Sequence, residues 1–142
     1  MLWVKEKIQE SQQTWKIVYY HHPTYSSRVL SPGGGKWPPE NLEKNSARKI
    51  DLPFSEWGVS AVLNGHLHLY ERIDINGTPC IINGLGGDEG RYTFQDGQPD
   101  PESKVRFFGE DDAMLIKAND EELSFKFITV AGKTVDEFTL KK

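Results

Sequence analysis

The sequence predicts a single α/β (α+β) domain, in which two buried strands end at histidines and antiparallel strands close the chain. Residues 15–20 and 59–64 are short β-branched and aromatic runs with the composition of buried strands. Residues 70–83 have the pattern of a β-hairpin around Asn76-Gly77. From residue 113 onward, apolar and polar residues alternate as in half-buried strands. With 142 residues, 37% of them hydrophobic, the chain is long enough for one core.

Residues 1–10 predict a short amphipathic helix, because Leu2, Trp3 and Ile8 are interspersed with lysine and glutamate. Residues 24–40 are rich in serine, proline and glycine and predict an irregular loop, long enough to close over a site. Residues 41–57 mix helix formers with Pro53 and are followed by Gly58. This segment therefore predicts a helix, a kink and a glycine cap.

Residues 84–90 form a glycine-rich segment that no lysine-bearing helix follows. We therefore expect close backbone packing there and no phosphate cradle. Residues 91–110, rich in aspartate, glycine and proline, predict loops. Three final strands are predicted at residues 113–118, 123–130 and 134–140, with turns between them.

Composition excludes several classes of partner. The formal charge is −4 and no basic run is interleaved with aromatics, so we expect no nucleic-acid partner. No stretch approaches the roughly 20 apolar residues of a membrane span, so we expect no membrane partner. The first residues do not resemble a signal peptide, and the sequence leaves the compartment open. Cys80 is the single cysteine, which excludes an internal disulfide and predicts a small buried apolar residue.

All four histidines fall into two clusters, His21-His22-Pro23 and Gly65-His66-Leu67-His68, each directly after a predicted buried strand. Imidazole binds zinc, iron, manganese and similar ions, and residues i and i+2 of an extended chain point the same way. The clusters therefore predict a metal site at the ends of the two strands. The competing interpretation is that histidines simply gather in polar loops.

Four short sequence motifs resemble those of the calcineurin-like metallophosphoesterases, and in particular those of the purple-acid-phosphatase-like branch of that family. They are WKIV leading into HHPTYS (residues 15–26), LPF with WGV (residues 52–59), GHLHLYER (residues 65–72) and NGLGG (residues 83–87). The last predicted strands are also similar to those of the family, so the resemblance spans nearly all 142 residues.

The resemblance implies two packed mixed β-sheets flanked by helices (αββα layers), and a pair of iron, zinc or manganese ions bridged by a carboxylate and a hydroxide that attacks phosphorus. Carried over by position, His21 and His66 would bind one ion and His68 the other. His22 would then face the phosphate and leaving group of a phosphate ester substrate.

One departure from the family is large. In the family, Asp-x-His, Gly-Asp and Gly-Asn-His motifs precede the part that this chain resembles and supply the remaining metal ligands. These motifs do not occur in residues 1–142 as they do in the family. Residues 1–142 are therefore interpreted as the C-terminal portion of such a domain, lacking the N-terminal metal-binding motifs. Because the strands at 17–20 and 59–63 are apolar on both faces, we expect exposed apolar surface that a missing N-terminal half or self-association would cover.

Three functions remain open. The first is metal-dependent phosphoester hydrolysis at a dinuclear centre that is incomplete here, so that the chain alone is weakly active or inactive. The second is a non-catalytic remnant that serves as a binding or structural module. The third is a histidine-only metal hydrolase, which would need an internal carboxylate. The candidates for that carboxylate are Asp88, Glu89, Asp111 and Asp112.

Two further groups of residues lie near the histidine clusters in the sequence or in the loop between them. Tyr70, Glu71 and Arg72 predict an ion pair at the start of a strand with a packed aromatic, outside catalysis. Tyr25 and Trp37 have the character either of pocket-lining aromatics or of exposed loop residues, and we expect the latter.

Overall fold

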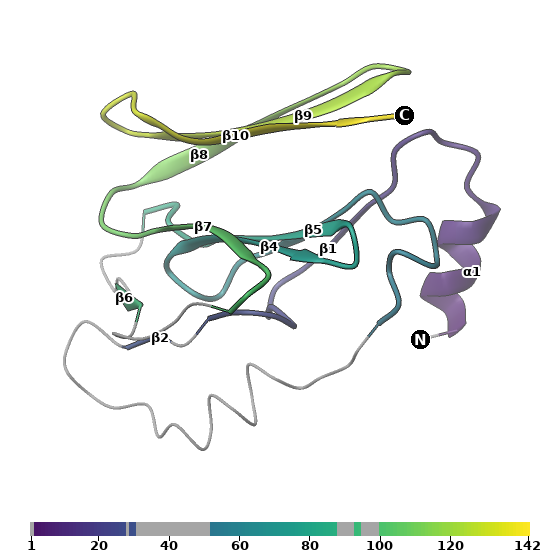
Figure 1. The fold of residues 1–142 in the computed structure, drawn as a ribbon, viewed down its shortest axis with the longest axis horizontal. Coiled ribbons are helices and arrows are strands. Elements are labelled where there is room, and N and C mark those ends of the chain that lie inside the picture. The colour runs from purple at the N-terminus through teal and green to yellow at the C-terminus, as the bar shows by residue number, and fades with distance from the viewer. Residues whose placement is uncertain (1, 28, 31–51, 88–92, 95–99) are drawn as a thin grey trace.

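The computed structural model describes residues 2–27, 29–30, 52–87, 93–94 and 100–142. Two layers of strands stack on each other, and the single described helix lies beside them (Figure 1). The elements are α1 (Leu2–Glu10), β1 (Ile17–Tyr20), β2 (Val29–Leu30), β3 (Ala61–Asn64), β4 (Tyr70–Ile75), β5 (Thr78–Asn83), β6 (Thr93–Phe94), β7 (Ser103–Phe107), β8 (Asp112–Ala118), β9 (Glu122–Thr129) and β10 (Thr134–Lys141). Within the described ranges, no helix is long and apolar enough to cross a membrane.

The larger layer is a five-stranded mixed sheet with the order β1-β3-β5-β4-β7. β1 pairs with β3, and β3 with β5, in parallel, whereas β4 runs antiparallel to both of its neighbours. Tyr20, the last residue of β1, lies opposite Asn64, the last residue of β3. The loops that follow these two strands therefore begin at the same edge of the sheet.

The predicted hairpin is confirmed as β4 and β5. Asn76 and Gly77 connect the strands with positive φ angles of 52° and 82°, and the Gly77 amide donates to Asp74 Oδ1 at 2.8 Å. Two consecutive residues with positive φ form the turn whose twist matches that of antiparallel strands, which is why Asn-Gly is favoured there.

The second layer is a three-stranded antiparallel sheet with the order β10-β9-β8, and it confirms the predicted final strands. Alternate residues of β9 are buried, and Phe125 and Phe127 are each 1% exposed. The Phe127 ring lies 3.9 Å from that of Tyr70 on β4, measured between ring centroids. The main core therefore lies between the two sheets, and this arrangement of mixed sheets with few helices confirms the predicted fold class.

A polar link also joins the two sheets. Asp136 on β10 accepts hydrogen bonds from Tyr70 Oη (2.7 Å), Arg72 Nε (2.7 Å) and Arg72 Nη2 (3.1 Å). Burial, together with the hydrogen bond to Asp136, raises the pKa of the Tyr70 hydroxyl. The ion pair expected at residues 70–72 is thus made by Arg72 with the other sheet, and Tyr70 is the packed aromatic.

On its other face, the five-stranded sheet packs against α1 and the turns at residues 54–58. Ile8, Phe54, Val62 and Cys80 belong to this second buried cluster. Cys80 is a free thiol with 5% exposure, as the sequence predicts.

Two expectations need correction. The run at 15–20 has the composition of a buried strand, yet Tyr19 is 82% and Ile17 37% exposed, because β1 is an edge strand among the described strands and the second sheet does not cover this face. This exposure agrees with the exposed apolar surface expected at residues 17–20. Residues 91–110 are not all loop, since they include β6 and β7. β7 was missed because Val105 and Phe107 are flanked by turn-forming residues, and only long-range packing against the main core reveals their role.

Part of the prediction for residues 24–57 lies outside the described residues, including residues 41–51 of the expected helix and most of the long loop. The described end of the expected helix, residues 54–58, forms consecutive turns and no α-helix. Gly58 has a φ of 79°, which is the conformation expected of the predicted glycine cap.

Gly84 packs closely against the loop that carries the second histidine cluster. A Cβ atom there would overlap the carbonyl oxygen of Leu67, and the Gly84 amide donates to the Leu69 carbonyl at 3.1 Å. At Gly86, by contrast, nothing lies within 4 Å of an added Cβ. Close backbone packing at Gly84 agrees with what we expected of the glycine-rich segment.

We predict that Asp136→Ala lowers the free energy of unfolding by about 3 kcal/mol, because it leaves Arg72 with an unpaired, largely buried charge. The neighbouring Glu137→Ala is the control. Its pair with Lys126 is largely exposed, so the loss should stay below about 1 kcal/mol. Urea unfolding of both variants measures the difference, and equal losses would contradict the role given to Asp136.

We predict that Gly84→Ala destabilises the chain by about 1–3 kcal/mol, because the added methyl group meets backbone that cannot rotate away. Gly86→Ala should change the free energy of unfolding by less than about 0.5 kcal/mol. Denaturant unfolding, with amide hydrogen exchange at residues 66–69, tests both. A Gly84→Ala variant as stable as the parent would show that the loop is not held by this contact.

Candidate metal centre

Parallel pairing brings the two histidine clusters to one edge of the larger sheet. His21 and His22 directly follow β1, and His66 comes two residues after the end of β3. Asn64 Nδ2 donates to the Tyr20 carbonyl at 2.8 Å, and the Gly65 amide donates to the His21 carbonyl at 3.0 Å. These two hydrogen bonds hold the beginnings of both loops together.

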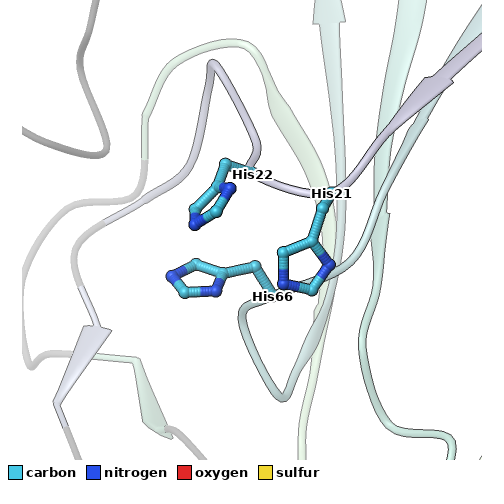
Figure 2. Close-up of side chains that lie close together, drawn as sticks. All are labelled: His21, His22 and His66. Carbon is cyan, nitrogen blue, oxygen red and sulfur yellow. The ribbon is translucent and has the colours of Figure 1, made fainter.

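Three imidazole rings converge at this edge (Figure 2). The ring centroids are 4.2 Å apart for His22 and His66, 4.9 Å for His21 and His22, and 5.2 Å for His21 and His66. One nitrogen from each ring lies within 4.8 Å of the other two. Nitrogens that share a tetrahedral zinc ion at about 2.0–2.1 Å lie roughly 3.4 Å apart, so small ring rotations would bring all three to one ion.

The backbone of the second loop differs from the extended conformation assumed for residues 66–68. His66 has a φ of 64°, a left-handed conformation that residues other than glycine seldom adopt. The Leu67 amide donates to the Gly65 carbonyl at 2.7 Å, and the Leu69 amide to the Leu67 carbonyl at 2.8 Å, so this loop is tightly turned. Backbone strain of this kind is typical of functional sites.

The structure thus brings together three of the four histidines singled out in the sequence. His21, His22 and His66 form the converging group, and His68, in the same loop, is not part of it. Because residues 65–69 turn tightly, the argument that i and i+2 point the same way does not apply to His66 and His68.

The electrostatics of the group favour neutral imidazole at its centre. His66 is partly buried, whereas His21 and His22 are exposed. Burial lowers the pKa of His66, and the nearby charges of His22, His21 and His68 lower it further. A neutral ring keeps the lone pair that a metal ion requires.

A groove of about 580 Å³ adjoins the histidines, between the edge strand β1 of one sheet and the edge strand β8 of the other. Its walls are largely apolar, and His21 is one of its lining residues. The others are Tyr19, Tyr20, Leu63, Asn64, Gly65, Asn83, Met114 and Ile116. Within the described part of the chain, Asn83 Oδ1 is buried without a hydrogen-bond partner. The groove therefore offers space beside His21.

The residues present fit one ion better than two. Three imidazoles with an open fourth position make a zinc-type catalytic ligand set. A dinuclear pair requires a bridging carboxylate, and the converging group of described residues contains none. Asp88 and Glu89 lie outside the described residues, and Asp111 and Asp112 at the start of β8 are not in the group.

Sequence reasoning missed one residue near the site and misjudged another. Glu71 is fully buried and holds the segment after the first histidine cluster, although its sequence context suggested only an ion pair. Tyr25 is half-buried and packs against the second core cluster rather than lying exposed, and Trp37 lies outside the described residues. The available signal for Glu71 was a charged residue inside a predicted strand.

No protein-family model matches the chain, and no curated protein matches it. Two solved structures are similar over almost all of its residues. The purple acid phosphatase PPD1 from yellow lupin (Lupinus luteus) seeds has a TM-score of 0.78 at 18% identity, and the match covers 99% of this chain and 28% of that one. GAP50, described as the anchor in the inner membrane complex of Plasmodium, has a TM-score of 0.64 at 18% identity, covering 97% of this chain and 40% of that one.

This chain thus spans well under half the length of either protein, and at these identities the likeness concerns the fold. The two matches agree with the fold that the sequence resemblance implies and with the sheets described above. The chain therefore has a calcineurin-like phosphoesterase fold, as the resemblance in its sequence implies.

Proposed function

We propose that this chain supplies the histidine side of a metal-dependent phosphoester hydrolase centre, which is completed by carboxylates that its described residues do not provide. The observation that carries the proposal is the convergence of His21, His22 and His66 at the ends of β1 and β3, in a fold shared with a purple acid phosphatase. The substrate class is a phosphate ester.

In the complete centre, His21 and His66 hold one ion, His68 holds the second, and His22 faces the phosphate and its leaving group. The 4.2 Å between the His22 and His66 rings supports this role, because it places His22 beside anything held by His66. When bound, the two ions supply charge neutralisation and an activated water. Iron, zinc and manganese all accept imidazole ligands.

On its own, the chain is expected to be weakly active or inactive. Three neutral imidazoles leave the charge of a cation uncompensated, whereas carboxylates would balance it and bridge the pair. The partner that we propose is the remaining N-terminal part of the phosphoesterase fold. The open edge of β1 and the groove beside it are where that part would add its strands and its carboxylates.

We predict that the purified chain on its own binds one zinc or cobalt ion, because one set of three imidazole nitrogens converges among the described residues. In this isolated chain His22 would act as the third ligand, whereas in the complete centre it would face the substrate. His66→Ala should abolish binding, since it leaves two of the three converging ligands. His68→Ala is the matched control in the same loop and should retain the ion. Metal analysis after dialysis gives the number of ions bound per chain for the parent and both variants.

Two outcomes would change this assignment. Two ions per chain, lost in both variants, would mean that residues outside the described ranges complete a dinuclear centre. No ion in the parent would mean that the histidines bind metal only together with the carboxylate-bearing part.

We predict that the isolated chain self-associates through the edge of β1, because Tyr19 is 82% exposed on a strand with one unpaired side among the described strands. Tyr19→Lys should give a monomer, since a charge on an edge strand opposes strand pairing. Val130→Lys, at a residue 79% exposed in a turn, is the control and should behave as the parent. Sedimentation and binding of a hydrophobic dye test this, and a monomeric parent that binds no dye would refute it.

A second candidate function is a non-catalytic binding or structural module. The similar fold of GAP50, an anchor by its description, favours it. The two candidates differ in one measurement, the hydrolysis of an aryl phosphate by the chain reassembled with its carboxylate-bearing part. Turnover that depends on His66 supports the hydrolase, and a folded, metal-loaded assembly without turnover supports the module.

A further inference from the structure

Glu71 on β4 is the most enclosed charged residue in the described part of the chain, with 0% exposure. It lies five residues after His66 in the sequence. No described lysine or arginine forms an ion pair with it, in contrast to Asp136, which pairs with Arg72. Hydrogen-bond donors help to hold the charge of a buried carboxylate.

Three serines supply those donors. Glu71 Oε2 accepts from the Ser27 amide at 2.8 Å and from Ser26 Oγ at 3.0 Å. Glu71 Oε1 accepts from Ser27 Oγ and from Ser103 Oγ, the latter at 2.8 Å. Three of these four hydrogen bonds come from residues 26 and 27, which lie just beyond the first histidine cluster. Glu71 therefore ties that segment to β4.

The segment that carries His22 is held at both of its ends. At its start, the Gly65 amide donates to the His21 carbonyl at 3.0 Å. Between the ends, Thr24 is buried and its Oγ1 lies 2.6 Å from Tyr20 Oη. At its far end, Glu71 holds residues 26 and 27. The strand that carries Glu71 begins two residues after His68, so one carboxylate connects both histidine loops.

We infer that Glu71 is a positioning residue of the metal centre, which fixes the loop of His21 and His22 so that their rings meet that of His66. This inference rests on the proposed function, because it assigns Glu71 to the same histidine site. The rings of His21 and His22 are exposed, so their placement comes from the backbone that carries them. Without the carboxylate, the Ser27 amide loses its buried acceptor and the loop is released.

The first test is a cobalt titration that follows the visible absorption of the bound ion. Glu71→Ala should weaken cobalt binding at least about tenfold, as loss of a residue that orients metal ligands typically does. Glu71→Gln should bind like the parent, because its amide oxygen accepts the Ser27 N–H and its NH₂ group donates to hydroxyls that also accept. Asp136→Asn, which alters the other buried carboxylate, should lower stability and leave cobalt affinity unchanged.

Equal weakening in Glu71→Ala and Asp136→Asn would reduce Glu71 to a general structural residue and overturn the inference. If Glu71→Ala does not fold, the cobalt affinity of the double variant Ser26→Ala with Ser27→Ala is compared with that of Asp136→Asn instead. It removes two of the four donors and keeps the carboxylate. It should weaken cobalt binding relative to Asp136→Asn, and unchanged affinity would again overturn the inference.

A metal-free measurement separates this inference from the proposed function. In the parent, nuclear Overhauser contacts should connect the ring protons of His22 and His66, whose centroids are 4.2 Å apart. These contacts should persist in Glu71→Gln and disappear in Glu71→Ala. Contacts that persist in Glu71→Ala overturn the role of Glu71. A parent that shows the contacts and binds no cobalt contradicts metal binding by the chain on its own and leaves the positioning role of Glu71 standing.

Discussion

The in-register parallel pairing of β1 with β3 is the constraint on which the candidate site depends. Tyr20 lies opposite Asn64, so the two histidine loops leave the sheet at the same level. A register shift of two residues would move one loop by about 6.6 Å along its strand. That displacement exceeds the 4.2 Å between the His22 and His66 rings, so such a shift would separate the converging group. The Asn64 side chain donates a hydrogen bond to the Tyr20 carbonyl and so strengthens the pairing at the strand ends from which the histidine loops leave.

β4 organises the structure on both sides of the larger sheet, because successive side chains of a strand point to opposite faces. Tyr70 and Arg72 reach Asp136 and join the two sheets, whereas Glu71, between them, reaches the serines that follow the first histidine cluster. The two buried carboxylates thus serve different ends. Asp136 is charge-balanced by Arg72 and links the sheets, while Glu71 is held by donors and anchors a loop.

One face of β1, which carries Tyr19, is not covered by the second sheet and adjoins the candidate metal centre. The second sheet packs over β3, β4 and β5 through Phe125 and Phe127 but leaves Tyr19 of β1 exposed. His21 lines the groove beside Tyr19, so the uncovered surface and the candidate metal centre are continuous. Added strands along this edge would bury apolar surface and bring new ligands to the histidines together, which couples assembly of the fold to assembly of the proposed centre.

The sequence by itself determined the features that depend on short-range patterns. These are the Asn76-Gly77 hairpin, the resemblance to a phosphoesterase, the position of the histidines at strand ends, and seven of the described strands, namely β1, β3, β4, β5, β8, β9 and β10. Only the tertiary structure decided which histidines converge, because the left-handed turn at His66 and its approach to His22 arise from strand pairing between distant segments. The pairing of Glu71 with Ser27 joins residues 44 positions apart, and that of Arg72 with Asp136 joins residues 64 apart. No local pattern encodes such contacts, since they form only when the sheets and their loops pack.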